Sequence, residues 1–305
     1  MADNDVKDVV VVGGGPGGLS AALALGRGRK KVLVCDAGTP RNAAAEEVHT
    51  FITRDGIPPR EFRRVAWEQM RPYDVELREA RVLNVERAGA VFRVELEGGD
   101  AVEARRVLLA TGMVDVMRDL PGYGDLWGKA IFQCPYCHGW ELQDRPWGVL
   151  ATSEPLLDFG VMLSGWTRDL VVFTQGAFEV SADKRALLTR AGIRLEERRV
   201  RSLIAAGPAL EAVELEDGTR VPREILFDRP PQRQVPLVQR LGLALDEEGF
   251  VKVTGPGATS VPGIYAAGDL CTRAQAAISS ASAGMLAAGM LNHGLNLERA
   301  GAARG

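Results

Sequence analysis

A strand, a glycine-rich loop and a helix follow one another within the first 25 residues, and this run constrains the fold most. Asp8–Val12 contains four consecutive valines, which is typical of a strand buried on both faces. The loop Gly13–Gly18 comes next, followed by an alanine- and leucine-rich helix expected over Leu19–Leu25 and a second strand expected over Lys31–Asp36. This order predicts a parallel βαβ unit.

The glycines of this loop have the spacing G-x-G-x-x-G, with an acid about twenty residues further on. Gly13 permits a tight turn, Gly15 lets the backbone approach a pyrophosphate, and Gly18 lets the helix pack on the strand. The helix N-terminus offers amide donors and the positive end of its dipole to phosphates. The alternative is an accidental glycine-rich turn, but strand, helix and acid are in register. Gly13, Gly15, Pro16, Gly18 and Asp36 are therefore predicted to bind a dinucleotide.

Length and charge narrow the class of protein. A chain of 305 residues is long enough for about two domains, and its net charge of −3 argues against nucleic acid or an anionic membrane as a partner. The acidic segment Met1–Asp5 lacks the features of a signal peptide, so a cytoplasmic location is expected. Ala274–Leu291 carries no charge but is rich in alanine and serine, which favours a buried helix against a cofactor over a membrane span.

Further pieces of the chain fit one known arrangement. Short alternating strands are expected over Arg81–Val85, Val91–Glu95 and Ala104–Leu109, and they end in Ala110-Thr111-Gly112. Gly263–Asp269 reads as a strand ending in Gly-Asp, followed by the uncharged helix. Together with the dinucleotide loop, these pieces resemble the FAD domain of the low-molecular-weight thioredoxin reductase family. The resemblance runs over nearly the whole chain.

The resemblance implies an α/β fold with two Rossmann-like domains, and it implies a homodimer. Residues 1–115 and 236–305 would form an FAD domain, split by a domain of the pyridine-nucleotide type over residues 116–235. Asp269 would bind the ribityl–phosphate region of FAD, and the helix beginning near Gln275 and Ala276 would direct its positive end at the flavin. The remaining candidate FAD contacts are Arg41, Asn42, His49, Ala110, Thr111, Gly112 and Gly268. For Arg41, Asn42 and His49, a solvated loop is the alternative.

The segment Cys134-Pro135-Tyr136-Cys137-His138 is the candidate reaction centre. A zinc site would need two more nearby ligands, and Cys35 and Cys271 lie far away in the sequence, so no metal is expected. A structural disulfide is uncommon in the cytoplasm, which leaves a redox-active pair as the favoured reading.

The resemblance also implies roles for these residues. Cys137 would face the flavin and pass it two electrons, while Cys134 would exchange with the sulfur of the substrate. The family usually carries an aspartate directly after the second cysteine, whereas this chain has His138. A histidine can accept a proton from a thiol at neutral pH. The alternative is that His138 merely fills a polar position.

The second nucleotide motif of the family is degenerate here. A strand is expected over Trp147–Ala151, a helix over Glu154–Ser164 and a second strand over Leu170–Phe173. The family's G-x-G-x-x-A falls on Ala151–Leu156, which lacks both required glycines. Thr174-Gln175-Gly176 replaces the cluster that would hold a 2′-phosphate, although Lys184 and Arg185 lie nearby and could compensate. NADPH is therefore an unlikely cofactor.

The chain thus keeps the FAD and dithiol motifs and loses the hydride-donor motif. It resembles the FAD-dependent dithiol oxidases that close the disulfides of gliotoxin and holomycin, which carry a C-x-x-C-H-G-(Tyr/Trp)-Glu stretch like the one ending at Glu141. The resemblance implies oxidation of a small-molecule dithiol or a protein thiol, with molecular oxygen as acceptor and hydrogen peroxide as product. Two alternatives remain: a disulfide reductase fed by ferredoxin or a second flavin, and a redox sensor.

Overall fold

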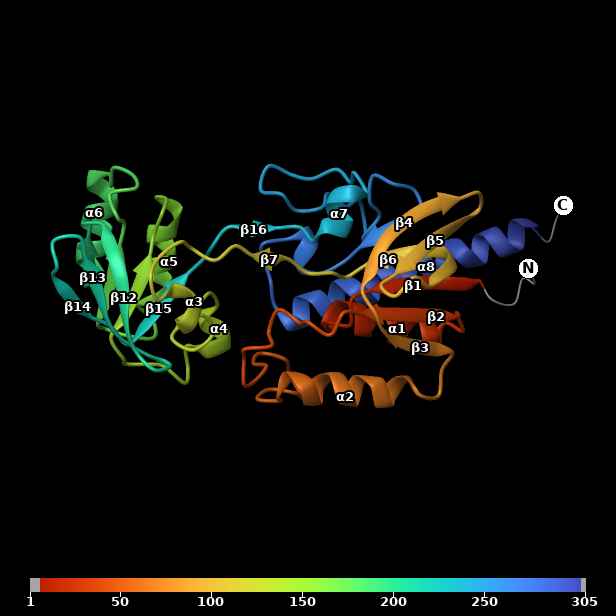
Figure 1. Ribbon diagram of the computed structural model, residues 1–305, viewed down its shortest axis with the longest axis horizontal. Coiled ribbons are helices and arrows are strands. Elements are labelled where there is room, and N and C mark those ends of the chain that lie inside the picture. Colours follow the sequence, from red (N-terminus) through yellow and green to blue (C-terminus); the bar gives the residue numbers. More distant parts are fainter. Residues whose placement is uncertain (1–5, 303–305) are drawn as a thin grey trace. The chain divides into compact units, whose positions relative to one another are not determined.

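The computed structural model describes residues 6–302, and the chain divides into two compact units (Figure 1). Unit 1 comprises Met1–Val114 and Gln232–Gly305, and unit 2 is the inserted Asp115–Pro231. The sequence-based boundaries after residues 115 and 235 differ from these crossings by one and four residues. Where the chain crosses, β7 (Val114–Asp115) and β16 (Gln232–Arg233) form a two-stranded sheet. Met1–Asp5, on which the expected cytoplasmic location rests, lies outside the described residues.

Unit 1 is built on a mixed sheet whose centre is parallel. The expected first strand forms as β1, and it pairs in parallel with β2 on one side and β6 on the other. The strand order is β3-β2-β1-β6-β5-β4, with β17 also paired to β6 in parallel and with β6-β5-β4 antiparallel. The bounds are β1 Lys7–Val12, β2 Val32–Asp36, β3 Val75–Glu79, β4 Val82–Ala88, β5 Val91–Leu96, β6 Ala101–Leu109 and β17 Ile264–Ala266.

Helices α1 (Pro16–Arg27) and α8 (Ala277–Ala302) pack together on one face of this sheet. Their backbones approach closely, because a Cβ atom built on Gly284 of α8 would overlap the carbonyl oxygen of Gly17 of α1. The opposite face of β1 and β2 packs in one core with side chains of β4 and β5 from the same sheet and with α7 (Pro236–Arg240). The remaining helices of the unit are α2 (Pro59–Met70) and the short 3₁₀ turn η1 (Asp269–Cys271).

Unit 2 has a parallel sheet of the order β11-β10-β9-β15-β8 between two layers. Helices α5 and α6 cover one face, and the antiparallel sheet β12-β13-β14 covers the other. The strands are β8 Ile131–Phe132, β9 Trp147–Leu150, β10 Leu170–Phe173, β11 Arg194–Glu196, β12 Val200–Ala206, β13 Ala209–Leu215, β14 Arg220–Pro222 and β15 Ile225–Asp228. The helices are α3 Tyr123–Leu126, α4 Pro135–His138, α5 Pro155–Leu163 and α6 Ala182–Arg190. The predicted fold class, α/β with two Rossmann-like units, is confirmed.

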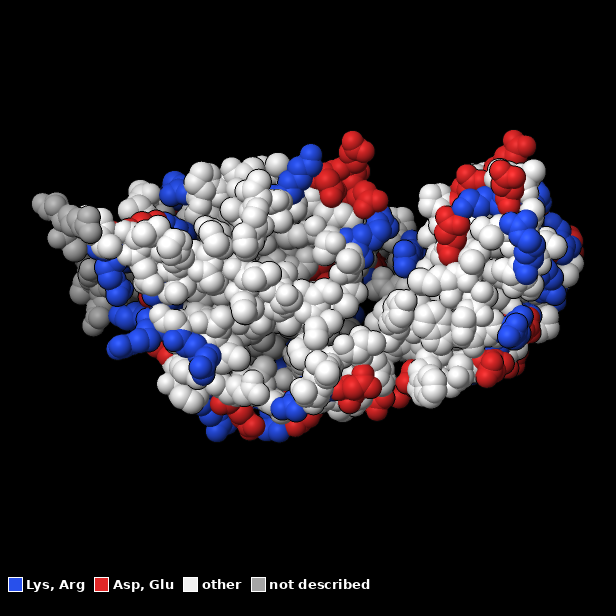
Figure 2. All heavy atoms as spheres, turned by 180° about the vertical axis from the view of Figure 1, so that it is seen from behind, with Lys and Arg blue, Asp and Glu red and all other residues white. Residues whose placement is uncertain are grey.

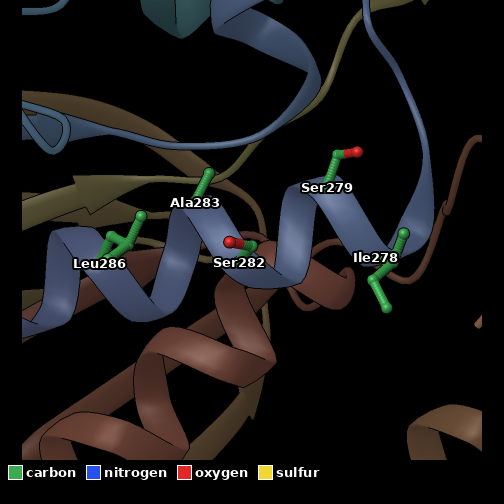
Figure 3. A pocket seen from close by; sticks show the side chains of 5 residues that line it. All are labelled: Ile278, Ser279, Ser282, Ala283 and Leu286. Atoms are coloured by element: carbon green, nitrogen blue, oxygen red, sulfur yellow. The ribbon is translucent and has the colours of Figure 1, made fainter. Parts of the chain in front are cut away.

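Helix α8 contains residues 277–291 of the uncharged stretch noted in the sequence. One side of it is buried against α1, and the other side exposes Ile278, Met285, Leu286 and Met290. A shallow depression lies along its first turns, lined by Ile278, Ser279, Ser282, Ala283 and Leu286 (Figure 3). On the body that carries both chain ends, Figure 2 shows a broad area free of Lys, Arg, Asp and Glu. Within residues 6–302, no helix is long and apolar enough to cross a membrane.

Candidate functional site

The predicted dinucleotide loop lies between the end of β1 and the start of α1. Gly13 has φ +112°, a backbone conformation that favours glycine, and a Cβ atom there would overlap the carbonyl oxygen of Ala110. The amide of Ala110 in turn donates to the carbonyl of Val12, at 2.8 Å. The Ala110-Thr111-Gly112 segment is therefore brought directly against the glycine loop, at the carboxyl ends of β1 and β6.

The residues present fit FAD. A Cβ atom built on Gly15 would meet nothing within 4 Å, so open space lies at the N-terminus of α1, where a pyrophosphate would be bound. Gly15 is the N-cap, and no side chain caps this helix, which leaves the first-turn amides for a ligand. The Thr111 hydroxyl is buried and has no hydrogen-bond partner among the described residues. A buried hydroxyl of this kind is ordinarily satisfied by a partner, and a bound cofactor would supply one.

Asp36 ends β2, as predicted, and is almost fully buried. One oxygen accepts from the amide of Gly38 at 3.2 Å, and the other pairs with the guanidinium of Arg63 on α2. Arg63 thus holds the carboxylate predicted to receive the ribose hydroxyls. Sequence reasoning missed Arg63 because it lies 27 residues away on a helix that no motif marks.

A polar cluster joins three of the predicted FAD residues. Arg41 donates to Asp269 at 3.2 Å and to the side-chain oxygen of Gln275 at 2.6 Å. Ser280 of α8 donates to the other oxygen of Asp269 at 2.8 Å, and Gln275 exchanges two amide hydrogen bonds with Gln232, at 2.8 and 3.0 Å. The cluster fixes the chain at the N-terminus of α8. Ser280 and Gln232 were not predicted, since neither belongs to a recognisable motif.

The remaining predicted FAD contacts of unit 1 lie outside this polar cluster. Asn42 lies in an exposed turn, and half-buried His49 lies between Glu47 and Asp55, with nitrogen-to-oxygen distances of 3.1 and 3.5 Å. Gly268 has φ +94° just before the η1 turn, and the carbonyl of Ala276 accepts the Ser280 amide at the start of α8.

The two cysteines of the CPYCH segment form a disulfide in unit 2. Cys134 is the N-cap of α4 and Cys137 lies inside it, with 5.3 Å between their Cα atoms. His138 is the last residue of this short helix, and its ring stacks on Phe132 at a centroid distance of 4.3 Å. The structure therefore places the three predicted catalytic residues on one helical turn, with the histidine anchored by an aromatic neighbour.

The remaining two cysteines lie in unit 1, where Cys35 is buried and Cys271 is partly buried. Burial raises the pKa of Cys35 to about 11 and the pKa of Cys271 to about 12, so both stay protonated thiols at neutral pH. Among residues 6–302, no cluster of three or more His, Cys, Asp or Glu could hold a metal ion.

The degenerate nucleotide motif lies at the carboxyl edge of the parallel sheet in unit 2, where such sheets bind their ligands. Ala151 is fully buried, and Glu154 is the N-cap of α5. The carboxylate of Glu154 accepts from the hydroxyl of Ser181, which caps α6, at 2.8 Å. A carboxylate therefore lies where a phosphate-binding loop would place backbone amides.

The adjacent strand end is filled by a buried polar cluster. Asp228, the last residue of β15, is fully buried, and it lies opposite Leu150 of β9 in the sheet. Arg118 donates to both of its oxygens, at 2.5 and 2.7 Å, and the Tyr123 hydroxyl donates at 2.7 Å. Burial and the Asp228 charge raise the pKa of Tyr123, so it remains a donor. The carboxyl end of β15, next to the end of β9, thus carries a hydrogen-bonded cluster of the chain's own side chains.

The two basic residues that could compensate for the missing phosphate cluster each have a carboxylate partner. Lys184 pairs with Asp158 at 2.5 Å, and Arg185 forms a two-pronged pair with Glu197 at 2.6 and 2.7 Å. Thr174 is fully buried at the end of β10, and no described residue hydrogen-bonds to its hydroxyl.

Two proteins of similar sequence are named thioredoxin reductases. The chain is 32% identical over 283 residues to thioredoxin reductase tcpT of Claviceps purpurea, covering 88% of each chain. It is 33% identical over 307 residues to thioredoxin reductase sirT of Leptosphaeria maculans, covering 94% of each.

Two solved structures are similar to this chain over nearly its whole length. HlmI superposes with a TM-score of 0.92 at 36% identity, covering 99% of this chain and 96% of that one. A putative thioredoxin reductase from Bacillus anthracis superposes with a TM-score of 0.89 at 34% identity, covering 96% and 99%.

The family model described as pyridine nucleotide-disulphide oxidoreductase matches residues 7–285, which include the parallel strands of both units and the cysteine pair. Membership implies an FAD cofactor, in agreement with the open loop at Gly15. The chain therefore belongs to the pyridine nucleotide-disulphide oxidoreductases and is an oxidoreductase of the thioredoxin reductase type.

Proposed function

We propose that this protein is an FAD-dependent thiol oxidase that forms disulfides in a small-molecule dithiol or a protein thiol. The observation that carries the proposal is the filled edge of the second sheet. Arg118 and Tyr123 both donate to Asp228 at the sheet edge where a hydride donor would bind. If no nicotinamide binds there, substrate thiols are the electron source with which the disulfide reacts directly.

The proposed reaction starts at Cys134. A substrate thiol loses its proton with help from His138, and its sulfur attacks Cys134, breaking the Cys134–Cys137 bond. The second substrate thiol then displaces Cys134 and closes the substrate disulfide. The substrate has lost two electrons and two protons, and Cys137 is the residue from which the electron pair leaves the protein chain. When bound, FAD supplies a two-electron acceptor that molecular oxygen re-oxidises, with hydrogen peroxide as product.

Oxygen consumption with dithiothreitol, with and without NADPH, tests this function. We expect uptake with the dithiol alone, one peroxide per disulfide formed, and no stimulation by NADPH. Anaerobic dithiol should bleach the flavin absorbance, and air should restore it. Bleaching by micromolar NADPH, or by reduced ferredoxin, would instead favour a disulfide reductase. Reduced flavin that is stable in air would contradict the oxidase and leave a redox sensor.

We further propose that two copies of the chain associate through α8 in the cytoplasm. The exposed side of this helix carries the apolar side chains of Ile278, Met285, Leu286 and Met290. Their exposure to water is unfavourable, and a second copy of the helix would cover them. Leu286→Arg should shift the sedimentation of the protein from dimer to monomer. Leu83→Arg, at an exposed position on β4, is the control and should leave it unchanged. A monomeric parent protein would contradict this interface.

A further inference from the structure

Two large aromatic side chains beside the disulfide are exposed. The side chain of Tyr136 is 60% exposed and that of Trp140 is 73% exposed, whereas Tyr123 and Trp147 of the same unit are fully buried. Core packing therefore does not explain why large aromatic residues stand at positions 136 and 140. Exposed apolar rings of this size at a reaction centre indicate a binding surface.

Tyr136 lies on the short helix that carries the disulfide, and Trp140 lies in the turn that follows it. Gly139 continues α4 in right-handed helical geometry, and its amide donates to the Pro135 carbonyl at 2.6 Å. Cys137 lies one residue from Tyr136 and three residues from Trp140. A substrate at the disulfide is therefore within reach of both rings.

The tyrosine ring is held in place by its neighbours. Tyr136 meets Trp166 edge to face, with 5.4 Å between the ring centroids and 86° between the planes. Gly139 permits this arrangement, because a Cβ atom there would come within 3.0 Å of the Trp166 indole ring. A ring fixed in this way loses little conformational entropy when a ligand stacks on it.

The charges near the disulfide in the sequence disfavour anionic thiols. Between Ala130 and Leu142 the only formal charge is the carboxylate of Glu141. The basic side chains that flank this segment point elsewhere: Lys129 donates to the Asp125 carbonyl at 3.1 Å, and Arg145 pairs with Glu224 at 2.6 Å. A thiol that carries carboxylates, such as glutathione, meets no Lys or Arg between Ala130 and Leu142.

We propose that Tyr136 and Trp140 form an aromatic platform that selects neutral dithiols with a flat apolar frame over polar or anionic thiols. This inference rests on the proposed thiol oxidation and names its substrate class. The frame stacks on the rings while a substrate sulfur attacks Cys134. The dithiol then closes its own disulfide, and the Cys134–Cys137 bond is reduced to two thiols.

Two matched dithiols test the platform. Dithiothreitol and 1,2-benzenedimethanethiol both have four carbons between their sulfurs, and both close a six-membered ring, but only the second has an aromatic frame. Full-length protein is mixed with each dithiol without oxygen and quenched with an alkylating agent. Mass spectrometry then counts the cyclised dithiol and the alkylated cysteines of a single turnover. Glutathione is the anionic comparison.

We expect the aromatic dithiol to half-saturate the wild-type reaction at a lower concentration than dithiothreitol. Trp140→Ala should raise that concentration about fivefold for the aromatic dithiol and less than twofold for dithiothreitol, in line with the strength of ring stacking. Tyr136→Leu should act in the same direction, while Trp140→Phe should retain most of the selectivity. Leu83→Ala, an exposed apolar position in unit 1, should change neither value.

Equal loss for both dithiols in Trp140→Ala would overturn the platform, because it would show that Trp140 only supports the fold. Wild-type protein that prefers glutathione or dithiothreitol would overturn it as well. The readout requires no oxygen. If the aromatic preference persists while reduced protein fails to consume oxygen, the oxidase proposal fails and the platform stands.

Discussion

At the scale of single residues, the four cysteines fall into two chemical classes. Cys134 and Cys137 form the disulfide on α4, whereas burial raises the pKa of Cys35 to about 11 and that of Cys271 to about 12. The thiolate is the reactive form of cysteine, and for the buried pair it becomes common only as the pH approaches those values. The two classes should therefore differ in reactivity at ordinary pH.

Alkylation measures this difference. In reduced, folded protein at pH 8, iodoacetamide should modify Cys134 and Cys137 and leave Cys35 and Cys271 unmodified, as read by peptide mass spectrometry. Raising the pH to 10 should increase labelling of the buried pair only slightly, and denaturation should expose all four cysteines. Rapid labelling of Cys271 at pH 8 would contradict its raised pKa.

His138 can be tested as a proton acceptor through the pH dependence of its loss. His138→Asn should slow reduction of the disulfide by dithiothreitol about 100-fold at pH 7, the size typical of general-base catalysis. Above about pH 9 most of the substrate thiol is already a thiolate, so the rates of variant and wild type should converge. Stopped-flow measurement across this pH range distinguishes a proton acceptor from a residue with a purely structural role. A loss that is equal at all pH values would mean that His138, stacked on Phe132, only supports α4.

At the scale of elements, the close packing of α1 on α8 depends on particular glycines. A Cβ atom on Gly284 would overlap the backbone of Gly17, so the two helices would have to separate. Because α1 also presents its N-terminus to the dinucleotide loop, separation should disturb both stability and FAD binding.

Gly284→Ala should lower the free energy of unfolding by about 2 kcal/mol or more, as overpacking of a tight contact does. It should also release FAD more readily. Gly289→Ala, on the same helix, is the matched control, since a Cβ there meets nothing within 4 Å. It should stabilise the protein by up to about 1 kcal/mol through helix propensity. Urea unfolding and FAD fluorescence measure both effects. Equal behaviour of the two variants would refute the packing argument.

At the scale of the whole molecule, the two units have separate hydrophobic cores, and unit 2 depends on a buried ion pair. Asp228 is fully buried, so Arg118→Leu would leave its carboxylate without its charge partner. This should cost unit 2 about 3–5 kcal/mol. Four of the five tryptophans lie in unit 2, so tryptophan fluorescence reports mainly on that unit, while FAD reports on the dinucleotide loop of unit 1.

Thermal unfolding of Arg118→Leu should therefore show an early tryptophan transition while FAD is still bound. Arg145→Leu removes an arginine from an exposed pair with Glu224 in the same unit, and it should change the transition little. A single unchanged transition in Arg118→Leu would show that the buried cluster contributes little to stability.

Much of the fold could be predicted from local patterns. The expected strand Leu170–Phe173 forms as β10 with the same bounds, and the first βαβ unit forms as β1, α1 and β2. These elements were predictable because valine runs, glycine spacing and strand-to-helix order act over short distances along the chain. By contrast, α2 and β3 were not predicted, and no element was expected between Pro59 and Glu79.

The sequence by itself determined the class of fold, the dinucleotide loop and the cysteine pair, because each depends on residues that are close together in the chain. Tertiary structure alone decided which side chains complete these sites. Arg63 reaches Asp36, Gln232 reaches Gln275 across 43 residues, and Tyr123 reaches Asp228 across 105. It also decided that Tyr136 and Trp140 remain exposed. Burial and long-range pairing depend on how strands and helices pack in three dimensions, and patterns in neighbouring residues do not predict this packing.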